Sequence, residues 1–537
     1  MRQKKGWLGN ACEYVGRNKL WTMDLSGITE SEGEEMATIG VDIGTSGCKA
    51  ALVAHDGRII AQAYREYACI AVPGGGLELD TDAVMEAAMN VIRNVSAETA
   101  DVSVQALSVS SIGESMAALD ANGKILNRLM IYNDTRGADV EAQLSARVNH
   151  QSFFAKTGYY PSRVSSACRI MWLREHRPET YERTVCFLPV NALLLFLLGA
   201  KPHIDHTLAS TTMLFDIWKK EWIPEHLAAA GIDRMLLPEL VAPGSVVGRI
   251  RKDRAVALGL PENVLLVAGG HDQQCVSLGA GVIGTGDCLD GLGSVEAIGV
   301  VPDRRPDMAR LARYHLSAEP HVLPDVYSVY GCAITAGTAV KWFRDCFCQD
   351  LIAATNADDE DVYERMFALL PERGNEVLWI PYFSGAGTPF NLPDARSLLI
   401  GAELRTGRGE LLRALLEGVA FEMQINLECL AAAGLAPRRI CTVGGLAKNA
   451  RYLQMKASII GCDVQTLAFN QAGALGAAIL AECACGGYPS LREAAERMVT
   501  YGGRIVPEPA QQTAYQKKYD AYRRNHPYYG MLDLDRR

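Results

Sequence analysis

The chain has 537 residues, a formal net charge of −9 and 49% hydrophobic residues. This length implies more than one domain, and ordinary contents of charged residues, glycine and proline exclude a mainly disordered, collagen-like or coiled-coil chain. The acidic balance gives no reason to expect a nucleic acid or an anionic membrane as partner. Fifteen cysteines without metal-site or disulfide spacing, and no signal-peptide pattern, favour a reducing cytoplasm.

Two segments could be mistaken for functional elements. Residues 1–35 lack the hydrophobic period that begins just after them, so we interpret them as a disordered or non-native extension, with Met36 as the hypothetical native start. The longest apolar run, 187–200, has 14 residues, fewer than the ~20 needed to cross a bilayer. We therefore expect a buried helix ended by Gly199, and no membrane segment.

The first patterned block reads as an α/β domain. A tight glycine turn and an Asp-Gly hairpin signal separate short apolar runs, and a helical period follows them. The pattern predicts, in chain order, strands over 38–43, 49–54 and 58–63, a helix over 81–95 and a strand over 104–109.

A second block opens near Asn263 with a similar alternation. The pattern predicts a strand over 264–268, a glycine hairpin near 289–295, a strand over 439–443, and helices over 449–460 and 473–484, the last rich in small residues able to pack closely. We therefore expect domains over 36–262 and 263–505, with a C-terminal tail or helix over 506–537.

Two glycine hairpins offer phosphate-binding chemistry. In the first, the turn places Thr45 and Ser46 between two glycines, with Asp42 before it and Lys49 after it. Such a turn lets backbone N–H groups and hydroxyls approach a phosphate, and Asp42 could hold Mg²⁺ through water. The alternative for one such turn is a plain hairpin. A second hairpin, at Gly293 and Ser294, favours a nucleotide gripped by two domains.

Other candidate residues sit at strand ends, where α/β proteins place reacting groups. Asp272 could take a proton from an attacking hydroxyl, or could simply cap the next helix. Glu114 could accept hydrogen bonds from polyol hydroxyls, or be a solvated turn carboxylate. Gly445 offers a flat backbone site for adenine or ribose, and Asn449 could bind the nucleotide or cap the following helix.

The motifs together resemble the FGGY family of carbohydrate kinases, a branch of the actin/Hsp70/hexokinase-like ATPases. Each motif alone is weak, but their order and spacing over 37–500 are specific. They are Ile39-Gly-Val-Asp-Ile-Gly-Thr-Ser-Gly-Cys-Lys49, Ile131-Tyr-Asn-Asp-Thr-Arg136, Gly269-Gly-His-Asp-Gln-Gln274, Pro381-Tyr-Phe-Ser-Gly385, Pro393-Asp-Ala-Arg396, Leu415-Leu-Glu-Gly-Val-Ala-Phe421, Gly444-Gly-Leu-Ala-Lys-Asn449 and Gly473-Ala-Leu-Gly-Ala-Ala478.

This resemblance implies an α/β fold of two ribonuclease-H-like domains, each with a five-stranded sheet, around an interdomain cleft that binds ATP and a sugar. Asp272 matches the catalytic base and Asp42 the Mg²⁺-associated aspartate. The implied ATP-binding residues are Thr45, Ser46, Lys49, Gly293, Ser294, Gly337, Gly445 and Asn449. The implied substrate-binding residues are Gly113, Glu114, Asp134, Asp272 and Gln273.

The implied activity is transfer of the γ-phosphate of ATP to a hydroxyl, usually primary, of a ketose or polyol. Dimers are common among such relatives, so a homodimer is an expectation. The motif Ser110-Ser-Ile-Gly-Glu-Ser115 departs from both xylulokinases and glycerol kinases, and resembles a branch often labelled L-fuculokinase-like. The sugar therefore stays open. The alternative function is a non-catalytic sugar-sensing or ATPase protein on the same fold.

Overall fold

The computed structural model describes residues 35–98, 102–354, 359–372 and 374–534. Residues 1–34, nearly all of the expected N-terminal extension, lie outside the described residues. The start at Met36 therefore stays a prediction. The chain forms two compact units. Unit 1 contains the described residues through Gly279, with Val322–Pro324 and Gly473–Met498; unit 2 contains Ala280–His321, Asp325–Ala472 and the described residues from Val499 onward.

Unit 1 is built on a six-stranded sheet in the order β14-β15-β6-β1-β2-β3. The first three strands along the chain form an antiparallel meander; β6 then pairs in parallel with β1, and β15 pairs in parallel with β6. The strands are β1 (Glu35–Ile43), β2 (Gly47–Ala54), β3 (Ile59–Glu66), β6 (Val102–Ser111), β14 (Val246–Arg249) and β15 (Leu265–His271).

Unit 2 repeats this arrangement in a seven-stranded sheet, β18-β19-β17-β16-β22-β23-β24. Here β16, β17 and β19 form the antiparallel meander, and β22 and β23 add in parallel. The strands are β16 (Asp287–Leu292), β17 (Glu296–Val300), β18 (Ser317–Pro320), β19 (Tyr327–Ala333), β22 (Arg439–Gly444), β23 (Val464–Leu467) and β24 (Tyr501–Ile505). The expected pair of ribonuclease-H-like domains is confirmed, with edge strands added to the five-stranded pattern in each.

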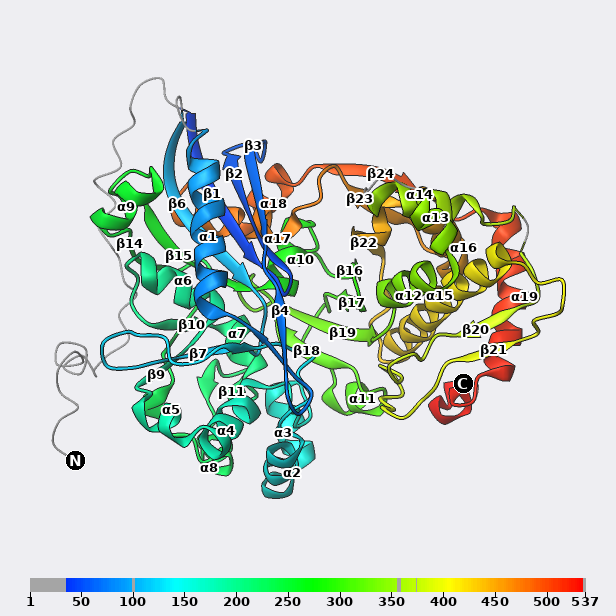
Figure 1. The fold of residues 1–537 in the computed structure, drawn as a ribbon, viewed down its shortest axis with the longest axis horizontal. Coiled ribbons are helices and arrows are strands. Elements are labelled where there is room, and N and C mark those ends of the chain that lie inside the picture. Colours follow the sequence, from blue (N-terminus) through cyan, green and yellow to red (C-terminus); the bar gives the residue numbers. More distant parts are fainter. Residues whose placement is uncertain (1–34, 99–101, 355–358, 373, 535–537) are drawn as a thin grey trace. The chain divides into compact units, whose positions relative to one another are not determined.

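Helices and short strands complete both units (Figure 1). The helices of unit 1 are α1 (Thr81–Ser96), α2 (Ala138–Arg147), α3 (His150–Thr157), α4 (Ser166–His176), α5 (Pro178–Arg183), α6 (Val190–Leu198), α7 (His206–Thr211), α8 (Pro224–Ala230), α9 (Lys252–Leu258), α10 (Asp272–Gly279), α17 (Ala472–Ala484, from Gly473) and α18 (Leu491–Met498). Those of unit 2 are α11 (Met308–Arg313), α12 (Gly337–Phe347), α13 (Gln349–Ala353), α14 (Asp359–Ala368), α15 (Arg408–Ala432), α16 (Ala450–Ile460) and α19 (Pro509–Asn525).

The short strands pair outside the two main sheets. They are β4 (Cys69–Val72), β5 (Gly76–Leu79), β7 (Met116–Leu119), β8 (Leu129–Met130), β9 (Cys186–Pro189), β10 (His203–Asp205), β11 (Phe215–Asp216), β12 (Glu221–Trp222), β13 (Glu239–Val241), β20 (Leu378–Ile380) and β21 (Leu398–Ile400).

The boundary between the units falls after α10, whereas the sequence pattern placed it at Asn263. Strand β15 pairs in parallel with β6, and α10 follows directly from β15. The glycine-rich signal lies at the carboxyl end of β15, inside unit 1, and does not mark the opening of a new domain.

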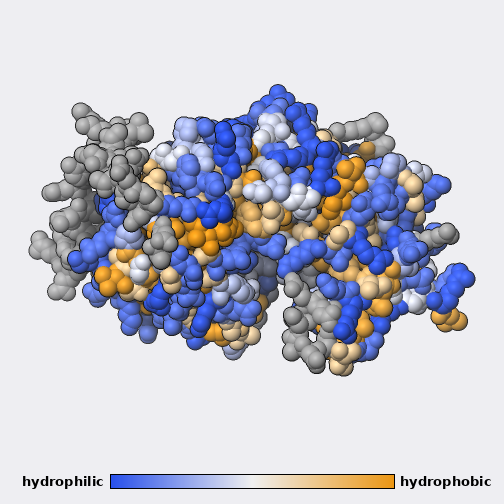
Figure 2. Space-filling view, turned by 90° about the horizontal axis from the view of Figure 1, so that it is seen from above, coloured by the Kyte–Doolittle hydropathy of each residue, from blue (hydrophilic) through white to orange (hydrophobic). Residues whose placement is uncertain are grey.

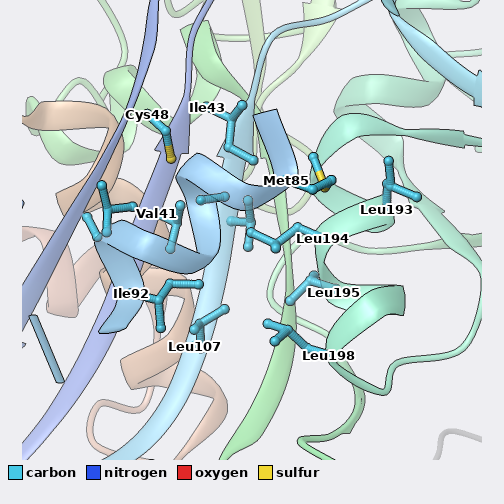
Figure 3. Packing of buried hydrophobic residues seen from close by; sticks show 14 of the residues in the cluster. Val41, Ile43, Cys48, Met85, Ile92, Leu107, Leu193, Leu194, Leu195 and Leu198 are labelled. Carbon is cyan, nitrogen blue, oxygen red and sulfur yellow. The ribbon is translucent and has the colours of Figure 1, made fainter. Parts of the chain in front are cut away.

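A hydrophobic core covers one face of the unit 1 sheet. Side chains of β1, α1 and α6 point toward one another there (Figure 3). Asp80 caps helix α1 by accepting a hydrogen bond from the Ala83 N–H, and the expected helix over 81–95 is confirmed. The expected helix over 187–200 is only partly right. Its first residues form β9 up to Pro189, α6 begins at Val190, and Gly199 follows the last residue of α6 as expected.

Helix α17 packs against the opposite face of the same sheet, since successive strand residues point to opposite sides. The Thr38 hydroxyl donates to the Ala478 carbonyl oxygen at 3.3 Å. A Cβ atom on Gly40 would lie 1.8 Å from the Ala474 oxygen, and one on Gly476 would lie 1.9 Å from the Cys275 oxygen. The small residues of α17 therefore permit backbone contact, as their pattern predicted.

Figure 2 shows hydrophilic residues over most of the face in view, with scattered apolar patches. None of the helices in the described part of the chain combines the length and the apolar character needed to span a membrane. All fourteen cysteines in the described ranges have free thiols.

Replacing Gly40 with alanine tests the packing of α17. The added methyl group would overlap backbone atoms that cannot rotate away, so we expect a loss of about 1–3 kcal/mol in the free energy of unfolding, measured by urea denaturation. Gly530→Ala is the matched control, because a Cβ there meets nothing within 4 Å. Equal stability of the two variants would contradict this packing.

Candidate functional site

The turn between β1 and β2 is held by its carbonyl groups. Tyr67 donates its hydroxyl to the carbonyl oxygens of Gly44 at 2.5 Å and Gly47 at 3.1 Å, and its N–H to the oxygen of Ser46. Gly44 N–H also donates to the Gly47 oxygen at 3.0 Å. Thr45 is half-buried and Ser46 is exposed. With the carbonyl oxygens engaged, the turn can offer N–H and hydroxyl donors to an anion.

Asp42 lies on β1 just before this turn. Ser110 on β6 donates its hydroxyl to Asp42 Oδ1 at 2.7 Å, and Lys49 is the register partner of Asp42 on β2. Burial raises the pKa of Asp42, while the Ser110 hydrogen bond and the Lys49 charge oppose that rise. A Cβ on Gly473 would lie 2.7 Å from Asp42 Oδ2, so the glycine is needed for the close approach of α17.

Asp272 stands at the end of β15, where α10 begins. Its Oδ1 accepts a hydrogen bond from the Gln273 N–H at 2.6 Å and lies 3.3 Å from His271 Nε2. Burial, reinforced by the negative charge of Asp42, raises the pKa of Asp272 to about 7. The parallel strands β1, β6 and β15 therefore bring the two predicted carboxylates into electrostatic contact.

Glu114 joins the same group with an unusual backbone. Its φ of 53° is left-handed, and two hydrogen bonds hold it: its N–H donates to the Thr211 hydroxyl at 3.1 Å, and its carbonyl accepts from Ser166 at 2.9 Å. Burial raises the pKa of the Glu114 carboxyl, and the charges of His271 and Arg169 oppose this rise. Strained backbone of this kind clusters at functional sites.

Gly113 leaves space for the side chain of His271, a residue that the sequence analysis did not assign to the site. A Cβ at this position would lie 3.0 Å from His271 Nε2 and 3.1 Å from the Thr211 methyl group. His271 is buried, and burial lowers its pKa, so its neutral form is favoured near pH 7. His271 directly precedes Asp272 in the motif, and this adjacency was the available signal.

Arg169, on α4, is a second residue that sequence reasoning missed. Its Nε donates to the Val164 carbonyl at 2.8 Å, while its buried Nη1 and Nη2 have no hydrogen-bond partner within the described ranges. Burial lowers the pKa of Arg169 to about 10, and Glu114 and Asp134 oppose that effect. No local pattern marks Arg169, because only the tertiary fold brings α4 toward Glu114.

Asp134 and Gln273 differ in their surroundings. Asp134 is 3% exposed, and its carboxylate accepts hydrogen bonds from the Arg136 guanidinium and from the Leu77 N–H at 3.0 Å. These bonds hold its pKa below the usual range against the effect of burial. Its oxygens thus already serve to tie β5 to the segment around Arg136. Gln273 is half-buried beside Asp272.

The second glycine loop, between β16 and β17 in unit 2, is also held by its carbonyl groups. The first N–H groups at α12 donate to it: Gly337 to the Gly293 oxygen at 3.0 Å, and Ala336 and Thr338 to the Ser294 oxygen at 3.1 and 3.2 Å. A Cβ on Gly337 would lie 2.5 Å from the Gly293 oxygen. Gly293 and Ser294 themselves are exposed.

The end of β22 supplies the last predicted group. Gly444 has a φ of 106°, and a Cβ there would lie 2.4 Å from the Leu292 oxygen. A Cβ on Gly445 meets nothing within 4 Å, so that backbone is open. The Asn449 side chain caps α16 by accepting from the Tyr452 N–H at 3.0 Å, which was the alternative role considered for it.

The predicted residues thus fall into two groups, one in each unit. Unit 1 gathers Asp42, Thr45, Ser46, Lys49, Gly113, Glu114, Asp134, Asp272 and Gln273, and unit 2 carries Gly293, Ser294, Gly337, Gly445 and Asn449. Unit 1 combines carboxylates of raised pKa with a donor-rich turn. Unit 2 has an exposed glycine loop and an open strand end.

Known proteins match the chain along most of its length. It is 28% identical over 492 residues to a xylulose kinase of Bacillus subtilis, covering 90% of this chain and 95% of that protein. It is 26% identical to an autoinducer-2 kinase of Klebsiella pneumoniae, covering 89% and 91%. A crystal structure described as a xyloylose kinase from Brucella ovis has the same fold, with a TM-score of 0.82 over 93% of this chain and all of that one, at 24% identity.

Two family models account for both units. The N-terminal domain of the FGGY family of carbohydrate kinases matches residues 37–279, and its C-terminal domain matches residues 280–485. Like the division of the structure, the junction of the two models falls after α10. The chain therefore belongs to the FGGY family of carbohydrate kinases.

Proposed function

We propose that this carbohydrate kinase transfers the γ-phosphate of ATP to a hydroxyl, usually primary, of a ketose or polyol, with Asp272 as the general base. The observation that carries the proposal is the pair of carboxylates at the strand ends of unit 1. The pKa of Asp272 is raised to about 7, which suits a group that must accept a proton near neutral pH.

The chemical step assigned to Asp272 is proton acceptance. As the sugar oxygen forms its bond to phosphorus and the bond to ADP breaks, the hydroxyl proton passes to Asp272. Its hydrogen bond from the Gln273 N–H and the nearby imidazole of His271 orient the carboxylate. Positioning and charge stabilisation supply most of the acceleration in such transfers.

Asp42 fits the Mg²⁺ site that the family implies. Its Oδ1 is held by Ser110, its Oδ2 accepts no hydrogen bond from any described residue, and its charge raises the pKa of Asp272. A divalent cation near Asp42 would relieve that repulsion, and Mg²⁺ favours one or two carboxylates with phosphate oxygens. Mg²⁺ bound there would offset negative charge on the phosphoryl group.

The nucleotide contacts are assigned to both units. Thr45, Ser46 and Lys49 in unit 1 are proposed to bind phosphate, as are Gly293 and Ser294 in unit 2. The open backbone at Gly445 is proposed to receive the adenosine. Asn449 and Gly337 would act mainly indirectly, because Asn449 caps α16 and Gly337 packs on the loop.

The sugar is proposed to contact Glu114, Asp272 and Gln273, with Gly113 shaping the pocket and Asp134 supporting it through Arg136. Relatives named for different substrates, xylulose and autoinducer-2, match this chain about equally well. The decisive test is a coupled assay of ADP release across xylulose, ribulose, fuculose, rhamnulose and four- or five-carbon polyols. ADP release that does not depend on any added acceptor would favour the ATPase alternative, and the absence of ADP release would favour the sugar-sensing one; the comparisons support neither.

A cytoplasmic location and a homodimer complete the proposal. Free thiols throughout the described ranges are typical of a reducing compartment. Light scattering of the purified chain tests the assembly, and a monomer at micromolar concentration would remove the homodimer.

Replacing Asp272 with alanine or asparagine should abolish proton acceptance while leaving the fold intact. We expect turnover with the preferred acceptor to fall by ~10²–10⁴, with ATP affinity close to that of the wild type. Turnover is measured by coupled ADP release, and nucleotide affinity by calorimetry. Near-normal turnover in either variant would remove Asp272 from this role.

The pH dependence of turnover should follow the ionisation of Asp272. Its raised pKa keeps the carboxyl protonated below about 7, so kcat/KM should fall about tenfold per pH unit below that value and level off above it. Initial rates between about pH 5.5 and 8.5 provide the measurement. A flat profile, with the chemical step limiting, would contradict the assignment.

A further inference from the structure

A lysine is fully buried beneath the second glycine loop. Lys456, on α16, donates from Nζ to Asp290 Oδ2 at 2.5 Å and to Glu296 Oε1 at 2.6 Å, and both carboxylates are also fully buried. Thr442, on the neighbouring strand β22, donates its hydroxyl to the same Asp290 oxygen at 3.0 Å. One cation therefore joins side chains of β16, β17 and α16.

The two acids stand on either side of the loop. Asp290 lies on β16, and Glu296 is the first residue of β17, with Leu292 as its register partner. The segment 293–295 connects these strands. Lys456 thus fixes both ends of the hairpin at its turn, while α12 binds the carbonyl oxygens of Gly293 and Ser294.

Stability alone does not account for this cluster. Removing three charged groups from water carries a large desolvation cost, and apolar side chains of similar volume often stabilise a core as well or better. Asp290 Oδ1 and Glu296 Oε2 are buried without a hydrogen-bond partner among the described residues, which adds to the cost. Burial and the negative charge of Asp290 raise the pKa of Glu296, and Lys456 opposes this rise. A geometric role explains better why the charges are present.

The two units use equivalent acids differently. Asp42 and Asp290 each precede a glycine loop on the first strand of their sheet, and each accepts from a hydroxyl at its register position on the parallel neighbour, Ser110 or Thr442. Asp42 is only half-buried, and although Lys49 is its register partner, none of the described lysines donates a hydrogen bond to it. In unit 2 the equivalent acid, Asp290, is fully buried and paired with Lys456 beside the loop at 293–295.

Helix α16 extends this link to the end of β22. It begins after the open backbone at Gly445, with Asn449 as its cap, and Gly444 packs against the Leu292 oxygen. The proposed phosphate loop and the proposed adenosine site are therefore joined through one helix and one ammonium group.

We propose that Asp290, Glu296 and Lys456 form a positioning cluster that fixes the loop at 293–295 against α16, so that its donors are aligned for nucleotide phosphates. This inference rests on the proposed nucleotide role of that loop. The three residues act through the loop and do not themselves contact substrate.

Glu296→Ala in the full chain cuts the link to β17 while leaving Lys456 paired with Asp290. We expect about tenfold weaker binding of ADP and of the ATP analogue AMP-PNP, because the phosphate donors lose their alignment, and an unchanged affinity for adenosine within about twofold. Glu296→Gln keeps an acceptor for Lys456 and should restore ADP affinity to within about threefold of the wild type. Calorimetry with the three ligands measures these values.

Glu417→Ala is the matched control, because Glu417 is an equally buried carboxylate of unit 2 paired with Arg413 and Lys518 on α15 and α19. It should lower the melting temperature while leaving ADP affinity unchanged. Lys456→Met would leave two buried acids without a cation, and such a variant could fail to fold. The test therefore uses the two variants Glu296→Ala and Glu296→Gln.

The outcomes separate the two proposals. A wild-type chain that binds no ADP overturns the nucleotide role of the loop and this inference with it. Normal ADP binding by Glu296→Ala, or an equal loss of ADP and adenosine binding, overturns the positioning cluster alone. Selective loss of phosphate-dependent affinity, rescued by glutamine, supports it.

Discussion

Repulsion between two carboxylates is the interaction on which the unit 1 site depends. Asp42 and Asp272 are placed on β1 and at the end of β15, and the parallel pairing of both strands with β6 holds them near each other. Partial burial weakens solvent screening, so the charge of Asp42 adds to desolvation in raising the pKa of Asp272. A bound cation would relieve this repulsion, so one arrangement suits both the proposed proton transfer and the proposed phosphate chemistry.

Much of this arrangement could be predicted from sequence because its signals are local. Glycine turns, a helical period of apolar residues and a run of small residues indicated the hairpins, α1 and α17 without reference to distant residues. Asp42 and Asp272 were identifiable because each lies next to such a signal.

The parts that could not be predicted depend on tertiary pairing. The apolar run over 187–200 has the pattern of one helix. Its first residues nevertheless belong to strand β9, which pairs with β7 and ends at Pro189, before α6. Strand β15 belongs to unit 1 because of its partner β6, and no feature of its own residues identifies that partner. Arg169 approaches Glu114 only through the packing of α4. Likewise, only the tertiary fold brings Lys456 to Asp290 and Glu296, which are distant from it in sequence.

The position of α17 in the chain also bears on how the protein is made. The face of the unit 1 sheet at Thr38 and Gly40 is covered by Gly473–Met498, residues that a ribosome delivers after nearly all of unit 2. Domains usually fold as their residues emerge, N-terminal first. Here one face of the earliest strands stays uncovered until residues 473–498 have been made. A chain that stops before Gly473 would therefore contain most of unit 2 and still lack the segment that covers this face of unit 1.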